Sequence, residues 1–349
     1  MIKHKYQFCI RFEDIDANSA ASKAVMDCNR IFSAQGYKDY TLTVGNNANR
    51  PKYYFKLLKE LLSFFLSVKN DAIIGIQYPL LSINSVFKHF IKLLKFKKIH
   101  FFCVVHDLES LRNGGKDLNL IKAEVNNLNA YSSLIVHNEQ MMGWLRKYGV
   151  TVPMISLHLF DYLTDDFAVP AGSLPAFNIV YAGNLQKSTF IYDLPKLDKC
   201  RFNLYGPGFR NEDNKEGSNL FWEGSYSPEQ IARELKGNFG LIWDGSSIEH
   251  CDEILGNYLR YNNPHKCSLY IAAGLPLIAP RSSAIGVLIQ QLKIGFLIDN
   301  LQELQTKIIT AADYKEMNNN VLKLREAVIK GKHFKLAIGA VENHYDAKQ

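Results

Sequence analysis

Short hydrophobic runs alternate with amphipathic segments along the first half of the chain. Continuous apolar runs of about four to eight residues are typical of buried strands, and apolar residues three and four positions apart are typical of helices. The strands that this pattern predicts are 6–12, 71–77, 99–106 and 133–137. The helices that it predicts are 19–35, 53–68, 82–96, 117–131 and 139–148. Strands that alternate with helices favour βαβ units and a parallel sheet.

The same alternation resumes after an interruption. Residues 161–175 are polar and contain Pro170, Gly172 and Pro175, which is typical of a linker. The strands predicted beyond it are 179–182, 202–205, 240–243, 276–279 and 295–298. Predicted helices are 228–235 and 265–273, and the tail from Gln302 onward is helical. We therefore expect an α/β fold of two Rossmann-like, doubly wound domains at 1–160 and 177–325, joined by a linker at 161–176 and followed by helices at 326–349, with a ligand cleft between the domains.

Composition narrows the class of protein. A length of 349 residues suits two domains, since domains average about 150 residues, and 47% hydrophobic residues exclude wholesale disorder. No apolar run approaches the roughly 18 residues that a membrane-spanning helix needs, and the N-terminus lacks the pattern of a secretory signal. The six cysteines are scattered singly, which favours free thiols in a reducing compartment. We expect a cytoplasmic protein.

The positive charge is concentrated in one segment. The net charge is +7, yet residues 50–100 alone hold ten Lys/Arg and two acids. A uniformly basic nucleic-acid binder is therefore not expected, whereas one basic face is. Lysines line one side of each predicted helix of this segment, namely Lys52, Lys56, Lys59, Lys88, Lys92 and Lys95. Two interpretations stay open: a peripheral contact of the helices around 52–98 with an anionic membrane surface, or two core-packed helices with solvated lysines.

Polar residues at the carboxyl ends of the predicted strands are the candidates for function, because those ends face the binding crevice of a parallel sheet. In the first half these candidates are Asp14, Asp16, His106, Asp107, Arg112, Gly114 and Asn138. In the second half they are Gly183, Asn184, Lys187, Asp244, Asn263, His265 and Lys266.

The second set suits a phosphorylated ligand. Asn263 and Pro264 predict the start of a helix, with Pro264 in the first turn and backbone N–H groups that attract an anion. Lys266 lies in the same turn, where its ammonium can meet a diphosphate. Lys187 and Tyr226 add a second cation and an aromatic ring. Both lysines also fit solvated surface positions.

Several short segments together resemble a known enzyme family. Asn263-Pro264-His265-Lys266 followed by SLYIAAGLPLI is similar to the nucleotide-sugar segment of GT-B glycosyltransferases. With HDLESLRNGG (106–115), HN (137–138), YAGNL (181–185) and LIWDG (241–245), the set resembles bacterial β-1,6-galactofuranosyltransferases of O-antigen and capsule assembly. More distantly it is similar to the glucosyltransferase that extends N-acetylglucosamine on serine-rich-repeat adhesins.

The resemblance implies a GT-B fold whose C-terminal half holds a UDP-sugar without metal or other cofactor, and C-terminal helices that return to the first domain. It implies contacts to UDP from Lys187, Tyr226 and Lys266, where Lys187 replaces an arginine and loses its bidentate fork. The helix HKCSLYIAAG lacks the carboxylate that grips ribose in the general GT-B pattern, so the ribose must be held otherwise. The implied reaction transfers galactofuranose from UDP to a glycan, with a lipid-linked O-antigen or capsule intermediate as acceptor.

Transfer needs a base for the acceptor hydroxyl and cations for the leaving diphosphate. Asp107 is the preferred base in an inverting displacement, with His106 as runner-up or orienting group. Asp107 fits equally a cap of the turn that follows it. Two alternative functions stay open: a transferase of UDP-glucose or another hexose with another acceptor, and a non-catalytic nucleotide-sugar-binding subunit of a glycosylation complex. The oligomeric state also stays open, with a homo-oligomer among the expected partners.

Two sequence features are of types that bind metals in other proteins, but neither predicts a metal site here. Asp14-Ile15-Asp16 is a DxD sequence, the metal-diphosphate motif of GT-A enzymes, but it follows the first strand, so we expect an acceptor-side or surface loop. His100, His106 and His137 do not predict one set of metal ligands, because His100 lies at the opposite end of its strand from His106.

Overall fold

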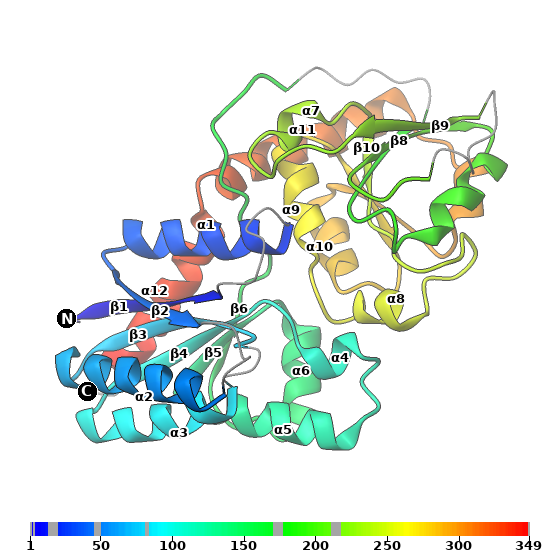
Figure 1. Ribbon diagram of the computed structural model, residues 1–349. Coiled ribbons are helices and arrows are strands. Elements are labelled where there is room, and N and C mark those ends of the chain that lie inside the picture. The colour runs from blue at the N-terminus through cyan, green and yellow to red at the C-terminus, as the bar shows by residue number, and fades with distance from the viewer. Residues whose placement is uncertain are drawn as a thin grey trace. The chain divides into compact units, whose positions relative to one another are not determined.

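The computed structural model describes residues 2, 4–12, 20–44, 50–80, 84–169, 177–210 and 218–347. The chain divides into two compact units (Figure 1). Unit 1 comprises residues 1–157 and 333–349, and unit 2 comprises residues 158–332. Asp14 and Asp16 lie outside the described residues.

Unit 1 is built on a six-stranded parallel sheet in the order β2-β1-β3-β4-β5-β6. Its strands are β1 (Lys5–Phe12), β2 (Lys38–Val44), β3 (Ile73–Tyr78), β4 (His100–Val105), β5 (Ser133–Val136) and β6 (Met154–Ser156). Its helices are α1 (Ala20–Ala34), α2 (Arg50–Ser67), α3 (Asn84–Leu94), the 3-10 turn η2 (Lys95–Lys97), α4 (Glu109–Arg112), α5 (Leu118–Leu128), α6 (Glu139–Lys147) and α12 (Lys332–Asp346).

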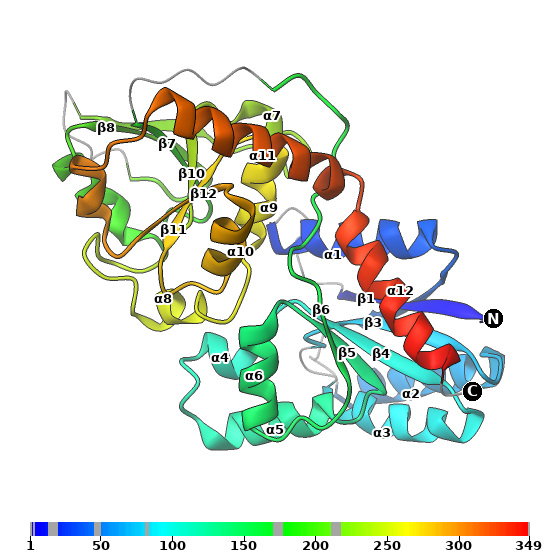
Figure 2. The same ribbon diagram turned by 180° about the vertical axis from the view of Figure 1, so that it is seen from behind.

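The two faces of this sheet are covered by different helices, because successive strand residues point to opposite faces. In β4, the ring of Phe101 lies 5.9 Å from Phe87 of α3, whereas that of Phe102 lies 5.8 Å from Phe32 of α1. Phe32 also contacts Phe334 of α12 at 4.9 Å, so α12 shares the face of α1 (Figure 2). A Cβ at Gly75 of β3 would lie 2.6 Å from Phe32, so glycine makes room for that ring.

Unit 2 holds a second six-stranded parallel sheet, in the order β12-β11-β10-β7-β8-β9. Its strands are β7 (Phe177–Ala182), β8 (Cys200–Tyr205), β9 (Leu220–Gly224), β10 (Phe239–Leu241), β11 (Leu277–Pro280) and β12 (Gly295–Ile298). Its helices are η3 (Thr189–Lys196), α7 (Ile231–Glu234), α8 (Ile254–Tyr258), α9 (His265–Ala272), α10 (Ile285–Leu292), η5 (Leu301–Gln305) and α11 (Ala311–Ile329). The strand order reverses between β7 and β10, which is the switch point where doubly wound sheets bind ligands.

Two parallel, doubly wound α/β sheets confirm the predicted fold class. The sequence pattern missed three strands at sheet edges, β2, β6 and β9, and the helices α4, η3, α8 and α10. β2 (KDYTLTV) lies at the edge of its sheet and alternates apolar with polar residues, so it lacks the continuous apolar run of the central strands. Among the described residues, no helix combines the length and hydropathy needed to cross a membrane.

Candidate functional site

A lysine–carboxylate pair lies at the switch point of unit 2. Lys266 of α9 places its Nζ 3.1 Å from Oδ1 of Asp244, in the loop after β10. The same ammonium lies 3.4 Å from the hydroxyl of Tyr181 at the end of β7 and 4.7 Å from the centroid of its ring. The side chains of Lys266 and Asp244 are only 16% and 23% exposed. β7, β10 and α9 therefore bring one cation, one anion and one aromatic ring together.

The charge of Lys266 is maintained by its neighbours. Burial, the largest single effect, lowers the pKa of the Lys266 ammonium group. The Asp244 carboxylate, together with Tyr181 and Tyr270, outweighs it, so the net pKa of Lys266 is raised. Lys266 therefore stays protonated over the whole range of ordinary pH. A protonated lysine beside a crevice is a stable anchor for a phosphate.

The start of α9 differs from the prediction at Pro264. Its φ of −65° and ψ of 142° make it the N-cap, so that His265 is the first helical residue, whereas Pro264 was predicted inside the first turn. Asn263, His265 and Ser268 contact the chain that follows β6. Asn263 Nδ2 donates to the carbonyl of His158, and Ser268 Oγ donates to the carbonyl of Phe160 at 2.6 Å.

His265 contacts the same preceding chain. Its ring stacks on Tyr162 at 5.1 Å between centroids, and its Nε2 lies 3.2 Å from the carbonyl oxygen of Asp161. Asn263 and His265 thus lie beside Lys266, and their contacts with His158, Asp161 and Tyr162 anchor α9. Their predicted role in binding a nucleotide-sugar stays a prediction.

Two glycine-containing turns meet beside the Lys266–Asp244 pair. The turn after β7 contains Gly183 and Asn184, and the turn after β8 contains Gly206. Gly206 has a φ of +127°, and a Cβ there would lie 1.9 Å from the carbonyl oxygen of Gly183. The Asn184 side chain accepts a hydrogen bond from the backbone of Gln186 at 3.1 Å, which shapes the turn that carries the exposed Lys187.

Tyr226 lies farther along the same edge. It follows β9, is 37% exposed, and its ring centroid lies 6.2 Å from that of Tyr205 in β8. β8 separates β9 from β7 in the sheet, so Lys187 and Tyr226 belong to turns on the β7-β8-β9 side of the switch point. Sequence reasoning missed Tyr181, whose signal is a phenol at the end of an otherwise apolar buried strand.

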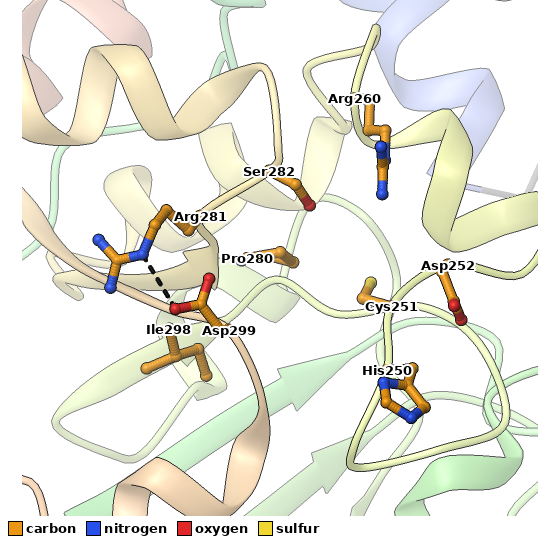
Figure 3. A pocket seen from close by; sticks show the side chains of 9 residues that line it. All are labelled: His250, Cys251, Asp252, Arg260, Pro280, Arg281, Ser282, Ile298 and Asp299. Atoms are coloured by element: carbon orange, nitrogen blue, oxygen red, sulfur yellow. Dashed lines mark hydrogen bonds and ion pairs between the residues drawn. The ribbon is translucent and has the colours of Figure 1, made fainter.

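A pocket of about 200 Å³ opens on the other side of the switch point, at the ends of β11 and β12 (Figure 3). Figure 3 shows Arg260 and Ser282 above Cys251, with Arg281 paired to Asp299 at 3.1 Å. The loop after β10 supplies His250, Cys251 and Asp252 to this pocket. The same loop supplies Asp244, which pairs with Lys266. Sequence reasoning did not assign this pocket.

The carboxyl edge of the unit 1 sheet carries a second polar group. Asp107, after β4, forms an ion pair with Arg112 of α4 at 3.1 Å, with side chains 31% and 48% exposed. Gly114, at a φ of +94°, lies in the turn after α4. Asn138 is buried, and its side chain caps α6 by accepting from the backbone of Met141 at 2.9 Å, which is a structural role.

His106 is oriented by a chain of amides. Gln77 Nε2 donates to the Asn29 side chain at 2.7 Å and to the carbonyl of Val25 at 3.2 Å. The Oε1 of Gln77 therefore accepts, and the Nε2 of His106, 2.6 Å away, carries the proton. The carbonyl of His106 in turn accepts from Nε2 of the buried His137 at 2.8 Å. His106 is thus held in one tautomer next to Asp107.

The loop that carries the Asp107–Arg112 pair rests on a buried carboxylate. Glu124 of α5 accepts from the backbone of Glu109 at 2.9 Å, from the backbone and hydroxyl of Ser110, and from the Tyr78 hydroxyl at 3.1 Å. Burial raises the pKa of Glu124, and these donors oppose that rise.

The described residues contain no group of three or more His, Cys, Asp or Glu that could hold a metal ion. His100 lies at the start of β4 and pairs with the Ser133 hydroxyl at 3.0 Å, whereas His106 follows the end of the same strand. His100 therefore lies at the opposite end of β4 from His106.

Family models cover both halves of the chain. Residues 7–159 match the N-terminal domain of the glucosyltransferase 3-like family, and residues 179–341 match its C-terminal domain. The β-1,6-galactofuranosyltransferase WbbI of Escherichia coli is 31% identical over 283 residues, covering 79% of this chain and 81% of that protein. Glucosyltransferase 3 of Streptococcus gordonii is 26% identical, covering 77% and 78%.

Solved structures support the fold. The trehalose-6-phosphate synthase of Burkholderia multivorans superimposes with a TM-score of 0.61 at 10% identity, covering 99% of this chain and 98% of that one. WaaG, a glycosyltransferase involved in lipopolysaccharide biosynthesis, superimposes with a TM-score of 0.55 at 12% identity, covering 97% and 98%. The chain therefore belongs to the glucosyltransferase 3-like family and has the GT-B fold of glycosyltransferases.

Proposed function

We propose that this glycosyltransferase takes a hexose, galactofuranose in the first instance, from a UDP-sugar and transfers it to a glycan acceptor. The observation that carries the proposal is the Lys266–Asp244 pair beside Tyr181 at the switch point of the unit 2 sheet. The choice of galactofuranose rests on the similarity to WbbI, and glucose is the alternative because of the similarity to glucosyltransferase 3.

Lys266 holds the diphosphate in this proposal. Its ammonium stays protonated and rests between the Asp244 carboxylate and the Tyr181 hydroxyl, so it is positioned before the donor arrives. As the bond from the sugar to the diphosphate breaks, negative charge grows on the leaving oxygen, and a fixed cation stabilises it. Lys187 supplies a second cation and Tyr226 a ring for the nucleoside, and with these two lysines the transfer proceeds without a metal ion.

Asp107 is the proposed base. Its carboxylate removes the proton from the acceptor hydroxyl while the hydroxyl oxygen bonds to the anomeric carbon and UDP leaves with the electron pair. One direct displacement inverts the anomeric configuration. Arg112 stabilises the ionised carboxylate, and His106 orients the acceptor beside it.

The acceptor in this proposal is a lipid-linked O-antigen or capsule intermediate at the cytoplasmic face of the membrane. The similarity to WbbI supports this acceptor class. The basic helices around 52–98 bring the enzyme to an anionic membrane surface, where such an acceptor resides.

One experiment tests the donor sugar, the role of Lys266 in binding the diphosphate and the role of Asp107 as the base. Purified protein is incubated with UDP-galactofuranose, UDP-galactose and UDP-glucose, and release of UDP is measured for the wild type, Lys266→Met and Asp107→Asn. We expect turnover of one donor, loss of UDP binding in Lys266→Met, and loss of turnover with retained UDP binding in Asp107→Asn. If no donor is turned over and none raises the melting temperature, the proposal fails; near-normal turnover by Asp107→Asn overturns the assignment of the base.

A further inference from the structure

Helix α2 is apolar on two opposite sides. Its inner side packs on the unit 1 sheet through the buried residues Leu57, Leu61, Phe64 and Val68. Its outer side carries four large apolar side chains at helical spacing that are 53–72% exposed, namely Phe55, Leu58, Leu62 and Leu66. A surface helix of a globular protein ordinarily has polar residues on its outer side. The outer side of α2 therefore lacks a partner within the described part of this chain.

The exposed apolar surface continues onto the end of α3. This helix covers the same face of the sheet as α2, since Phe8 of β1 contacts both Phe64 and Phe87 at 5.0 Å, and both views show the two helices side by side (Figures 1 and 2). Leu93, in the last turn of α3, is 43% exposed, and Phe96, in η2 beyond it, is 86% exposed. We call this set the apolar strip: Phe55, Leu58, Leu62, Leu66, Leu93 and Phe96.

Lys97 fixes the two helices together at this end. Its Nζ donates to the carbonyls of Phe65 at 2.5 Å and Val68 at 2.9 Å, the last turn of α2 and the residue beyond it. Its ammonium also lies 4.8 Å from the Phe65 ring centroid. The strip is therefore held on a packed scaffold of two helices. At about 1.5 Å per residue, the part of the strip on α2, from Phe55 to Leu66, has a length of about 17 Å.

Exposed lysines border the strip on both helices. They are Lys56, Lys59, Lys69, Lys92, Lys95 and Lys98. In the whole stretch 50–100 the acids are Glu60 and Asp71 only. Apolar side chains flanked by lysines on a helix surface fit the boundary of an anionic bilayer, where the apolar groups enter the acyl region and the ammonium groups meet the headgroups.

The charge disfavours a second copy of this chain as the occupant. A twofold dimer places the same patch of each subunit against itself. That arrangement would oppose two sets of lysines with hardly any acids between them, and like charges across an interface oppose binding. An anionic lipid surface offers apolar and negative groups together.

We infer that the apolar strip inserts into the interface of an anionic bilayer and docks unit 1 on the membrane. This inference rests on the proposed transfer to a lipid-linked acceptor, and it names the part of the protein that reaches the membrane. Docking through α2 and η2 leaves the carboxyl edge of the unit 1 sheet, with Asp107 and Arg112, on loops that take no part in insertion.

Vesicle flotation of the full chain tests the inference. Wild-type protein is expected to float with phosphatidylcholine–phosphatidylglycerol vesicles and not with phosphatidylcholine alone. The double variant Leu58→Ser/Leu62→Ser is expected to lose about tenfold in partitioning to anionic vesicles, and Lys92→Glu/Lys95→Glu a similar factor. Leu336→Ser on α12 is the matched control, because Leu336 is 74% exposed outside the strip and its replacement should leave flotation unchanged.

Three results would overturn the inference: no flotation of the wild type, equal flotation of the Leu58/Leu62 variant, or a wild-type dimer in light scattering that the same variant converts to monomer. Circular dichroism and the melting temperature show that each variant is folded. UDP release with a water-soluble acceptor does not require membrane. Lost flotation with normal turnover therefore contradicts only the docking, and normal flotation without turnover contradicts only the proposed function.

Discussion

Lys266 and His137 are both buried ionisable side chains, and their surroundings affect them in opposite ways. Lys266 faces a carboxylate and stays charged. Burial dominates at His137 and lowers its pKa to about 4, because its hydrogen bond to the backbone carbonyl of His106 opposes burial only weakly. His137 is therefore neutral at ordinary pH, and its Nε2–H fixes the backbone of His106 beside the proposed base.

The histidine makes the stability of unit 1 depend on pH. Between its unfolded pKa of 6.5 and its folded pKa of about 4, the unfolded chain binds a proton that the folded chain does not. The free energy of unfolding should therefore fall as the pH drops through this window, by up to about 3 kcal/mol from this group. Denaturant unfolding at several pH values measures it. His137→Gln, which keeps a donor for the His106 carbonyl, should flatten the fall; an unchanged slope would contradict the prediction.

At the residue scale, sequence reasoning named both members of the Lys266–Asp244 pair because each follows a recognisable strand or helix start. It had no means of showing that they touch, since 22 positions separate them. Tyr181 escaped because strand propensity alone accounts for a tyrosine there. Asn138 was named from its position at a strand end, and the structure shows it as a helix cap. Position at a strand end therefore predicts proximity to the edge of the sheet and leaves the role open.

At the scale of elements, the turns after β7 and β8 depend on each other. Gly206 combines a φ of +127° with an approach that leaves no space for a side chain, because a Cβ would lie 1.9 Å from the Gly183 carbonyl oxygen. The Gly183 turn, next to Tyr181, can therefore take its position only because Gly206, in the turn after β8, has no side chain.

Gly206→Ala should displace the Gly183 turn. We expect a loss of roughly 1–3 kcal/mol in unfolding free energy, because backbone strain and a steric clash act together, and about tenfold weaker UDP binding. Calorimetric titration with UDP and denaturant unfolding measure the two effects. Gly143→Ala on α6 is the matched control: no atom lies within 4 Å of its Cβ position, so both quantities should stay unchanged or stability rise slightly.

Glu124 links α5 to the turn that carries Asp107 and Arg112. Glu124→Gln keeps the shape but replaces an acceptor oxygen with an amide NH2 group, a donor, which leaves one or two of the buried donors around it unsatisfied. The turn should shift, and displacement of a catalytic group by about 1 Å lowers a rate by about 100-fold. We therefore expect a large fall in kcat with unchanged UDP affinity. Equal losses in both would show that Glu124 acts on the fold alone; Glu139→Gln, exposed on α6, is the control.

Elements with a clear hydrophobic pattern were predicted well. Three strands at the edges of the sheets, which lack a continuous apolar run, were not. The central strands β3, β4 and β11 are buried at almost every residue, so their apolar runs identify them. β2 and β9 lie at sheet edges, where β2 alternates polar with apolar residues and β9 fully buries only its first residue. The outward apolar side of α2 was also hidden in the sequence, because Leu57 and Leu58 look alike until the sheet shows which one it buries.

At the scale of the whole molecule, each unit has its own sheet and its own group of polar residues. The proposed donor residues, from Gly183 to Lys266, all lie in unit 2, and the proposed base lies in unit 1. The chain returns to unit 1 at its C-terminal end, where α12 contributes Phe334 to the core and Glu342 to a 2.9 Å hydrogen bond from the Tyr37 hydroxyl. Sequence periodicity identified the helices of the tail, whereas these long-range contacts come only from the structure.

This division of residues predicts two separable thermal transitions. In the proposed function UDP contacts residues of unit 2 alone. At about 100 times its dissociation constant it should therefore add about 2.7 kcal/mol to the stability of that unit and raise one transition in scanning calorimetry. The other transition should stay in place. Tyr37→Phe removes the hydrogen bond to Glu342 and should lower only the transition that UDP does not move. If UDP raises both transitions equally, or if Tyr37→Phe lowers the UDP-sensitive one, the two units unfold together and the donor residues are coupled to the base through the fold itself.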